Sequence, residues 1–326
     1  MGIVHYLNVK NGDCSIIEHP SGHITVIDVC NARKDEDINS SNLFSIARII
    51  DNKNFYQKSN PTNPITYMQR HGITNVFRFI LTHPDMDHMD GIKDFFEEFN
   101  PTNFWDIKNK CIKSDWGKGA YRKEDWDFYC SIRDKKTEFQ TKRLTMYAET
   151  LGQFFNKNEN GEKGGDGLYI LSPTQNLVNY ANTCDDYNDT SYVILYRSKA
   201  GKILFAGDSH DKTWEHILDN YSSEVKNMDI LIAPHHGRDS GRSYEFLDII
   251  NPKLTLFGNA PSKHLSYGQW HRKNLNTITN NQAGNIIIDT NKVQMQVYIT
   301  NKNYAEQQNS ATFYCPNLKA YYLKEI

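Results

Sequence analysis

The sequence predicts an α/β protein built from two β-sheets whose outer faces are covered by helices. Short runs rich in β-branched and aromatic residues, which are typical of strands, recur along the whole chain. Segments whose apolar residues recur at helical spacing lie between many of these runs. Strands with interposed helices are typical of layered α/β architectures, and 326 residues suffice for one large domain or two ordinary ones.

The N-terminal segment predicts three strands joined by turns. The runs "IVHYLNV" and "CSIIEHP" are joined by the turn "KNGD", and "ITVIDV" follows the turn "PSGH". This last run ends in Asp28, for which a turn cap is the simpler interpretation. Residues 32–75 are charged and Asn-rich, and "SNLFSIARIID" at 41–51 has helical spacing, so we interpret 32–75 as a helical insertion.

The middle of the chain continues with a buried strand, "VFRFILTH", and a helix, "GIKDFFEEFNP", that stops before Pro101. Residues 102–165 are aromatic and charged, and we interpret them as a second insertion or lid. The strand "LYILSP" follows, and "TSYVILYRSKAGKILFAGD" predicts a hairpin with its turn around Ala200 and Gly201. We then expect helices at "TWEHILDNY" and "SYEFLDIINP", and strands at "MDILIAP", "KLTLFGN" and "NIIIDTNKVQMQVYIT".

Composition excludes several classes of protein. The formal net charge is −2 and the isoelectric point is about 6.6, so no global basic field indicates binding to nucleic acid or to a membrane surface. No apolar stretch approaches the length of a membrane span, so we expect no membrane partner. The six cysteines include no C-x-x-C pair, which argues against a cysteine zinc module and favours a reduced, cytoplasmic protein.

Residues 81–91, "LTHPDMDHMDG", predict a metal site at the end of a strand. Imidazole and carboxylate alternate here at His83, Asp85, Asp87 and His88. A solvated acidic loop is the alternative interpretation, but such a loop gains nothing from histidines at both ends. These residue types are ligands of divalent cations.

Two further strands end in residues that bind metals. "KILFAGD" ends in Asp208, and "DILIAPHHG" ends in His235 and His236. Functional side chains in layered folds collect in loops after strands, so three such ends favour one shared site.

These motifs resemble the metallo-β-lactamase superfamily. "LTHPDMDHMDG" resembles its metal motif in the form H-x-D-x-D-H, where H-x-H-x-D-H is commoner. "YLNVKNGDCSIIEHPSGHITVIDV", "NDTSYVIL", "ILFAGD" and "LIAPHHG" resemble, in order and spacing, the ComEC-type branch, which is named for the hydrolase domain of the DNA-uptake protein ComEC. The resemblance covers nearly the whole chain except 32–75 and 102–165.

The resemblance implies a single four-layer αββα sandwich over residues 1–326, with one or two metals at one edge. It implies that His83 and Asp85 hold the first metal, that Asp87 and His88 hold the second, and that Asp208 bridges them. His235 would complete the second site. The family's third histidine of the first site has no counterpart, because Asn188 or Asp189 occupies that stretch.

The implied ligand set favours phosphodiester hydrolysis. Asp85 in place of histidine makes the first site harder, which suits Mn²⁺ or Mg²⁺, although Zn²⁺ also binds such sets tightly. We therefore expect two divalent ions, with Mn²⁺ supporting activity at least as well as Zn²⁺. Two metals generate a hydroxide nucleophile and stabilise both oxygens of an in-line displacement. We also expect Asp87 to be essential for hydrolysis.

Other residues are candidates for contact with the substrate. The family's late Gly–His pair is replaced by Gly268 and Gln269, and either His264 or His271 is a candidate proton donor, with a plain surface histidine as the alternative. Arg238, Arg242 and Lys263 lie near the double histidine in sequence and are candidates for facing a phosphate. The candidate substrate-binding residues are Asn188, His236, Arg238 and Lys263.

Three functions then compete. The first is a metal-dependent nuclease on DNA or RNA, with the basic and aromatic residues of 102–165 contacting a single strand. The second is a hydrolase of a small substrate, such as a cyclic nucleotide, lactone or thioester. A closed pocket would favour the second, and an open basic groove the first. The third is a non-catalytic binding module. The insertions also offer surfaces for a partner protein or a homodimer.

Overall fold

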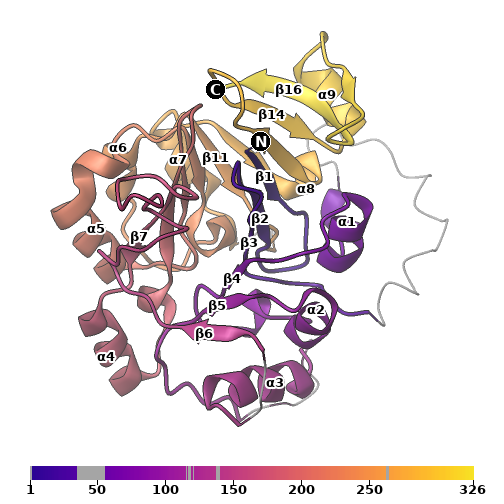
Figure 1. Cartoon of the computed structure of the whole chain (residues 1–326). Coiled ribbons are helices and arrows are strands. Elements are labelled where there is room, and N and C mark those ends of the chain that lie inside the picture. Colours follow the sequence, from indigo (N-terminus) through magenta and orange to yellow (C-terminus); the bar gives the residue numbers. More distant parts are fainter. Residues whose placement is uncertain are drawn as a thin grey trace.

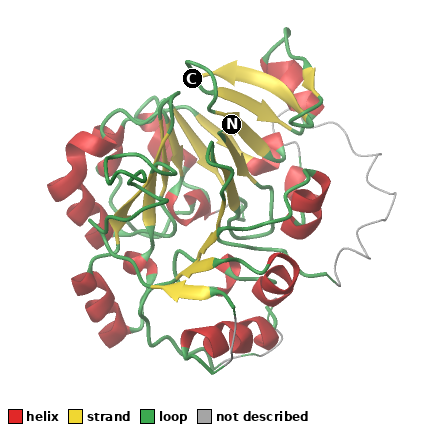
Figure 2. Cartoon of the chain, viewed as in Figure 1, coloured by secondary structure: helices red, strands yellow, loops and turns green. Residues whose placement is uncertain are grey.

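The computed structural model describes residues 2–34, 56–114, 116, 119, 121–136, 140–261 and 264–326. Two sheets face each other, with helices against their outer sides, so the predicted α/β class and the four-layer αββα arrangement are confirmed (Figure 1; Figure 2). The expected helix at 41–51 lies outside the described residues.

The larger sheet combines the N-terminal strands with the end of the chain. Its order is β15-β16-β14-β13-β1-β2-β3-β4-β5-β6, antiparallel from β15 to β3 and parallel from β3 to β6. The strands are β1 (Ile3–Tyr6), β2 (Ser15–Glu18), β3 (Ile24–Ile27), β4 (Arg78–Ile80), β5 (Asn103–Trp105), β6 (Lys142–Leu144), β13 (Ile286–Asp289), β14 (Gln296–Ile299), β15 (Tyr314–Cys315) and β16 (Ala320–Glu325).

The smaller sheet has the order β12-β11-β10-β9-β8-β7, and β9 to β12 are parallel. The predicted hairpin is β8–β9, and Gly201 in its turn has φ +143°. The strands are β7 (Leu168–Ser172), β8 (Val193–Arg197), β9 (Lys202–Phe205), β10 (Ile230–Ile232), β11 (Leu254–Phe257) and β12 (Thr277–Thr279).

The helices cover the outer faces of the two sheets, as Figure 1 shows. The larger sheet carries α1 (Pro64–Arg70), α2 (Ile92–Phe99) and α3 (Lys123–Arg133). Against the smaller sheet lie α5 (Asp211–Val225), α6 (Phe246–Ile250) and α7 (Tyr267–Arg272). The others are α4 (Gln175–Cys184), α8 (Asn280–Ala283) and α9 (Lys302–Gln308). None of the described helices is both long and apolar enough to cross a bilayer.

The strands are apolar on both faces because each face is covered. In β9, Ile203 and Phe205 join the core between the sheets, whereas Leu204 joins the core under α5, α6 and α7. Side chains alternate between faces along a strand, so an uninterrupted apolar run is what a sheet between two layers requires.

The segment 102–165 is partly continuous with the fold. It contributes β5 and β6 to the larger sheet, and α3 packs against α2. All six cysteines are free in the structure.

A buried ion pair ties the residue that directly follows this segment to the larger sheet. The Arg78 guanidinium donates to Asp166 Oδ2 at 3.1 Å and to Thr25 Oγ1 at 2.7 Å. Both charged side chains are almost fully buried, at 2% and 1% exposure. Removing one partner of such a pair leaves the other charge buried and uncompensated.

We therefore expect Asp166→Asn to lower the free energy of unfolding by about 3 kcal/mol, measured by urea denaturation. The matched control is Glu224→Gln, which breaks the exposed Arg197–Glu224 pair and should cost less than about 1 kcal/mol. Equal losses in the two variants would contradict a structural role for the buried pair.

Candidate metal centre

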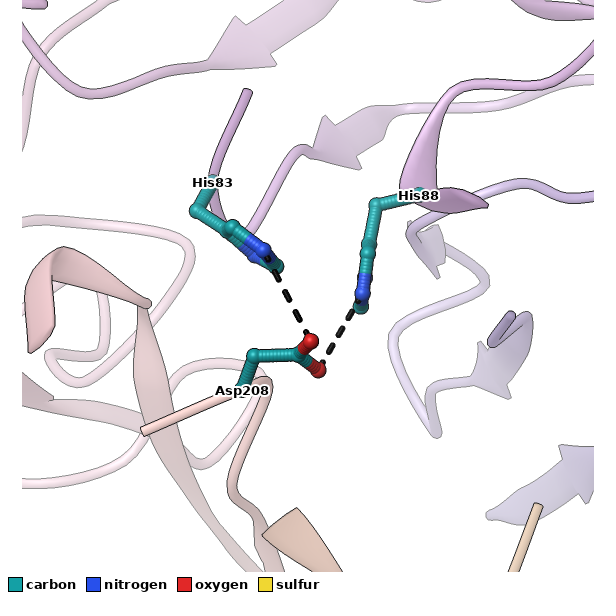
Figure 3. A group of neighbouring side chains, drawn as sticks. All are labelled: His83, His88 and Asp208. Atoms are coloured by element: carbon teal, nitrogen blue, oxygen red, sulfur yellow. Dashed lines mark ion pairs between the residues drawn. The ribbon is translucent and has the colours of Figure 1, made fainter. Parts of the chain in front are cut away.

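The candidate metal centre lies where loops from both sheets meet. His83 follows β4, and His88 ends the short 3-10 helix η3 (Met86–His88). Asp208 follows β9, and the double histidine lies in the 3-10 helix η5 (Pro234–Gly237) after β10. Figure 3 shows His83 and His88 directed at Asp208 from the opposite sheet. The prediction that these strand ends share one site is therefore consistent with the structure.

Asp208 occupies the middle of the cluster, with two imidazoles near each carboxylate oxygen. The Nε2 atoms of His83 and His235 lie 3.8 and 3.5 Å from Oδ2. The Nε2 atoms of His88 and His236 lie 3.1 and 3.8 Å from Oδ1. The Asp208 side chain is 2% exposed, so its charge is largely shielded from water.

The histidines can be divided by the Asp208 oxygen that each one faces, and His83 and His88 also form one group of close donor atoms with Asp208 across this division. Asp85 Oδ2 lies 3.5 Å from His83 Nε2, which adds Asp85 to the half that contains His83 and His235. Asp87 Oδ2 lies 3.4 Å from His236 Nε2, and Asp87, His88 and His236 form one group of mutually close donor atoms.

The geometry favours a different division of the double histidine from the predicted one. We expected His235 to join Asp87 and His88, and His236 to contact the substrate. The structure instead places His236 with Asp87 and His88, and His235 beside the Asp208 oxygen that faces His83. His235 therefore lies on the same side of Asp208 as His83.

The donor atoms fit a divalent cation. His83 Nε2, His88 Nε2 and His236 Nε2 are buried and have no hydrogen-bond partner in the described part of the chain, and the same holds for Asp208 Oδ1. Burying unpaired polar atoms costs free energy, and divalent cations bind imidazole nitrogen and carboxylate oxygen. His83, His88 and Asp208 also place one donor atom each within 4.8 Å of one another.

Two further aspartates lie against the Nδ1 atoms of the second half, in a hydrogen bond at His88 and an ion pair at His236. Asp28 Oδ2 lies 2.8 Å from His88 Nδ1 and also accepts from Thr82 Oγ1 at 2.7 Å. Asp13 Oδ2 lies 3.0 Å from His236 Nδ1, and Tyr6 donates to the other oxygen of Asp13 at 2.7 Å. A carboxylate on Nδ1 fixes the ring orientation and leaves Nε2 for a metal.

Opposite charges balance around the centre. Burial would lower the pKa of His88, but Asp208 and Asp28 raise it well above its ordinary value. Burial likewise opposes protonation of His236, yet Asp13 and Asp208 raise its pKa to about 10. For Asp208, burial would raise the pKa, whereas the facing histidines hold it well below its usual range. The carboxylates therefore attract positive charge to this point.

His235 differs from its neighbour. Burial lowers its pKa to about 4 despite the nearby Asp208, which keeps the imidazole neutral, the form that binds metals. His235 and His236 have φ of +53° and +57°, and Gly237 follows with +84°. A Cβ at Gly237 would overlap the Phe257 ring. Consecutive left-handed residues that are not glycine are costly, and such strain collects at functional sites.

The residues near 188 make local contacts in the structure. Asn188 begins the 3-10 helix η4 (Asn188–Thr190), and its backbone N–H donates to Asp186 Oδ1 at 3.2 Å. Asp189 Oδ1 accepts the backbone N–H groups of His210 and Thr213 at 3.2 and 3.1 Å. Asp189 is thus engaged at the start of α5.

The cations predicted to face phosphate have different environments. Arg242 is buried and donates to the Ser209 carbonyl at 2.7 Å, which supports the loop after Asp208. Arg238 is half-buried and forms a β-bridge with Leu265. Lys263 lies outside the described residues.

The two late histidines also differ. Asp239 N–H donates to the His264 carbonyl at 2.6 Å, so the backbone of His264 lies against the segment that follows the double histidine. His271 is exposed on α7, with its ring stacked 6.4 Å from Tyr267. The role of either as proton donor stays a prediction.

A pocket of about 290 Å³ adjoins the centre, lined by Asp85, Met86, Asp87, Lys113, Trp116, Gly119 and Tyr121. Lys113 Nζ donates to Asp85 Oδ1 at 2.8 Å. The segment 102–165 thus supplies one wall and a cation beside the candidate ligands.

Sequence reasoning missed Asp13, Asp28 and Lys113 as parts of the site. Asp13 lies in "NVKNGDCSII" and Asp28 lies in "ITVIDV", both within the segment that resembles the ComEC-type branch, and that resemblance was the available signal. Lys113 belongs to the basic and aromatic residues of 102–165, but only the folded chain places it beside Asp85.

Comparison with known proteins gives likeness in structure only. No protein-family model matches the chain, and no curated protein matches it. Among solved structures, the chain is similar to Igni18, a metallo hydrolase from the archaeon Ignicoccus hospitalis, with 10% identity, a TM-score of 0.46, and coverage of 88% of this chain and 99% of that one.

It is also similar to the metallo-β-lactamase fold protein YhfI from Bacillus subtilis, with 9% identity, a TM-score of 0.43, and coverage of 86% and 96%. A diphosphatase from the PhnP family matches with 12% identity, a TM-score of 0.41, and coverage of 85% and 94%. These likenesses concern the fold alone.

The division of ligands is testable through metal content. We expect His235→Ala and His236→Ala each to lower bound metal from about two to about one per chain, measured by elemental analysis after dialysis, because each removes a ligand from a different half. The His83→Ala/His235→Ala double variant should keep one metal, because both changes fall in one half. The His83→Ala/His236→Ala double variant should lose both.

His216→Ala, on the outer helix α5, is the control and should leave metal content unchanged. If the double variant with His235→Ala lost both metals and the one with His236→Ala kept one, the division would be the reverse of that described.

Proposed function

We propose that this protein is a metal-dependent hydrolase of the metallo-β-lactamase superfamily, of the ComEC-type branch, and that it cleaves phosphodiesters in DNA or RNA. The observation that carries the proposal is the pair of donor groups that share the buried Asp208. The oxygen donors Asp85, Asp87 and Asp208 are compatible with Mn²⁺, Zn²⁺ or Mg²⁺.

The residues divide between two metals. His83, Asp85 and His235 would hold one, and Asp87, His88 and His236 the other, with Asp208 shared. When bound, such a metal pair supplies an activated water and neutralises the charge that develops on both oxygens of an in-line displacement.

The surrounding side chains position and charge the site. Asp28 and Asp13 hold the imidazoles of His88 and His236, so their Nε2 atoms stay directed at Asp208. Lys113 places a cation beside Asp85, where it can attract an anionic substrate. His264 and His271 remain the candidates for giving a proton to the leaving oxygen.

A hydrolase of a small substrate is the second candidate function. The 290 Å³ pocket, walled by residues of 102–165, is at the lower end of the size of small-ligand sites. A cyclic nucleotide would fit both this pocket and phosphodiester chemistry.

A metal-stripped activity assay tests the proposal. Protein reloaded with Mn²⁺, Mg²⁺ or Zn²⁺ is offered labelled single-stranded DNA, RNA and bis-p-nitrophenyl phosphate. We expect metal-dependent cleavage of the polymers, with Mn²⁺ at least as effective as Zn²⁺, and its loss in Asp87→Ala. Cleavage of the small ester alone would select the second candidate, and no cleavage by metal-loaded protein would refute a phosphodiesterase.

Metal preference tests Asp85 separately. We expect Asp85→His to shift the ratio of Mn²⁺-supported to Zn²⁺-supported activity toward Zn²⁺ by about tenfold, because nitrogen replaces a harder oxygen donor. Asp127→His, on the exposed side of α3, is the control. An unchanged ratio would show that Asp85 does not bind metal.

A further inference from the structure

The pocket beside the metal centre combines two kinds of surface. Asp85 and Asp87, both candidate metal ligands, line it together with Lys113, Trp116 and Tyr121 from the 102–165 segment. Because Asp85 and Asp87 are candidate metal ligands, a molecule in this pocket would lie next to the reacting atoms. The other residues have no part in holding metal, and their chemistry indicates what else the pocket binds.

Lys113 is held in place and can still donate. Its ammonium donates to Asp85 Oδ1, while the other oxygen of Asp85 faces His83 Nε2, so Asp85 can serve both at once. Lys113 Nζ lies 5.9 Å from the centroid of the Trp126 ring, and the Lys113 carbonyl accepts from Trp116 Nε1 at 3.0 Å. An ammonium has three donors, so one bond to Asp85 leaves others for an anion in the pocket.

Trp116 and Tyr121 give the pocket aromatic walls. Both side chains are partly buried and pack against the main core, which fixes them without hiding them. Met86 adds a polarisable thioether to the lining. Planar aromatic walls next to a cation suit a ligand with a flat ring and an anionic group, and base stacking on such side chains is worth several-fold to over a hundredfold in affinity per base.

We propose that this pocket is a subsite for one nucleoside of a phosphodiester substrate. The base stacks on Trp116 and Tyr121, and Lys113 contacts the phosphate at the edge formed by Asp85 and Asp87. A volume of about 290 Å³ accommodates about one nucleotide, so the substrate must present an unpaired nucleotide. This inference rests on the proposed phosphodiesterase function and names its substrate class.

The test compares two esters that share a leaving group. Thymidine 5′-(p-nitrophenyl phosphate) carries a base, and methyl p-nitrophenyl phosphate does not. We expect the Mn²⁺-loaded protein to prefer the thymidine ester in kcat/KM by about tenfold or more, chiefly through KM. Trp116→Leu and Tyr121→Leu should each reduce this preference, whereas Trp116→Phe and Tyr121→Phe should keep most of it.

Comparing the Phe and Leu variants isolates the contribution of the aromatic ring to binding. Both changes at Trp116 remove the indole N–H that donates to the Lys113 carbonyl, so only the aromatic face differs between them. Lys113→Met should lower kcat/KM for both esters, because both carry the phosphate. Lys302→Met, at an exposed position on α9, is the matched control and should change neither.

Binding of thymidine 5′-phosphate, measured by calorimetry, separates the subsite from the reaction. If Trp116→Leu weakens this binding and Trp116→Phe keeps it, the result supports the subsite even when no ester is cleaved. The absence of cleavage would then refute only the phosphodiesterase. Cleavage of both esters with equal kcat/KM, or equal loss for both in Trp116→Leu, would overturn the subsite while the hydrolase stands.

A single-stranded oligothymidylate, offered beside the thymidine ester, then distinguishes the source of the nucleotide. Turnover of the oligomer that depends on Trp116 assigns the subsite to a nucleic-acid strand. Turnover of the thymidine ester alone assigns it to a free nucleotide.

Discussion

The structure depends on one buried carboxylate that four imidazoles share. The Asp208 side chain is almost fully buried, and an uncompensated charge at this position would cost a large free energy of desolvation. His88 and His236, whose pKa values Asp208 helps to raise, supply compensating positive charge. The Nε2 atoms of His83, His88 and His236 supply places for a divalent cation. The loops after β4, β9 and β10 must therefore end at one point.

The direction of the strands in the two sheets brings these loops together. Strands β3 and β4 are parallel in one sheet, and β9 and β10 are parallel in the other, so their carboxyl ends lie at one edge. The turn that holds Asp13 reaches the same edge, and a Cβ on the neighbouring Gly12 would overlap the Asp87 carbonyl. This close backbone contact lets a carboxylate from the first turn hold His236.

The segment 102–165 adds a wall beside the candidate metal ligands. Its strands extend the larger sheet, α3 packs on α2, and Asp166, which directly follows the segment, pairs with the buried Arg78 of β4. On this support Lys113 reaches Asp85, and two aromatic side chains stand beside the ligands.

Sequence alone predicted most strands, the two-sheet class and the candidate metal ligands, because these follow from apolar periodicity and from His and Asp at strand ends. It could not decide which of two adjacent histidines joins Asp87 and His88. That choice depends on the left-handed backbone at His235 and His236, which directs the imidazoles to different oxygens of Asp208. The roles of Asp13, Asp28 and Lys113 likewise depend on contacts between residues distant in the chain, which no local pattern encodes.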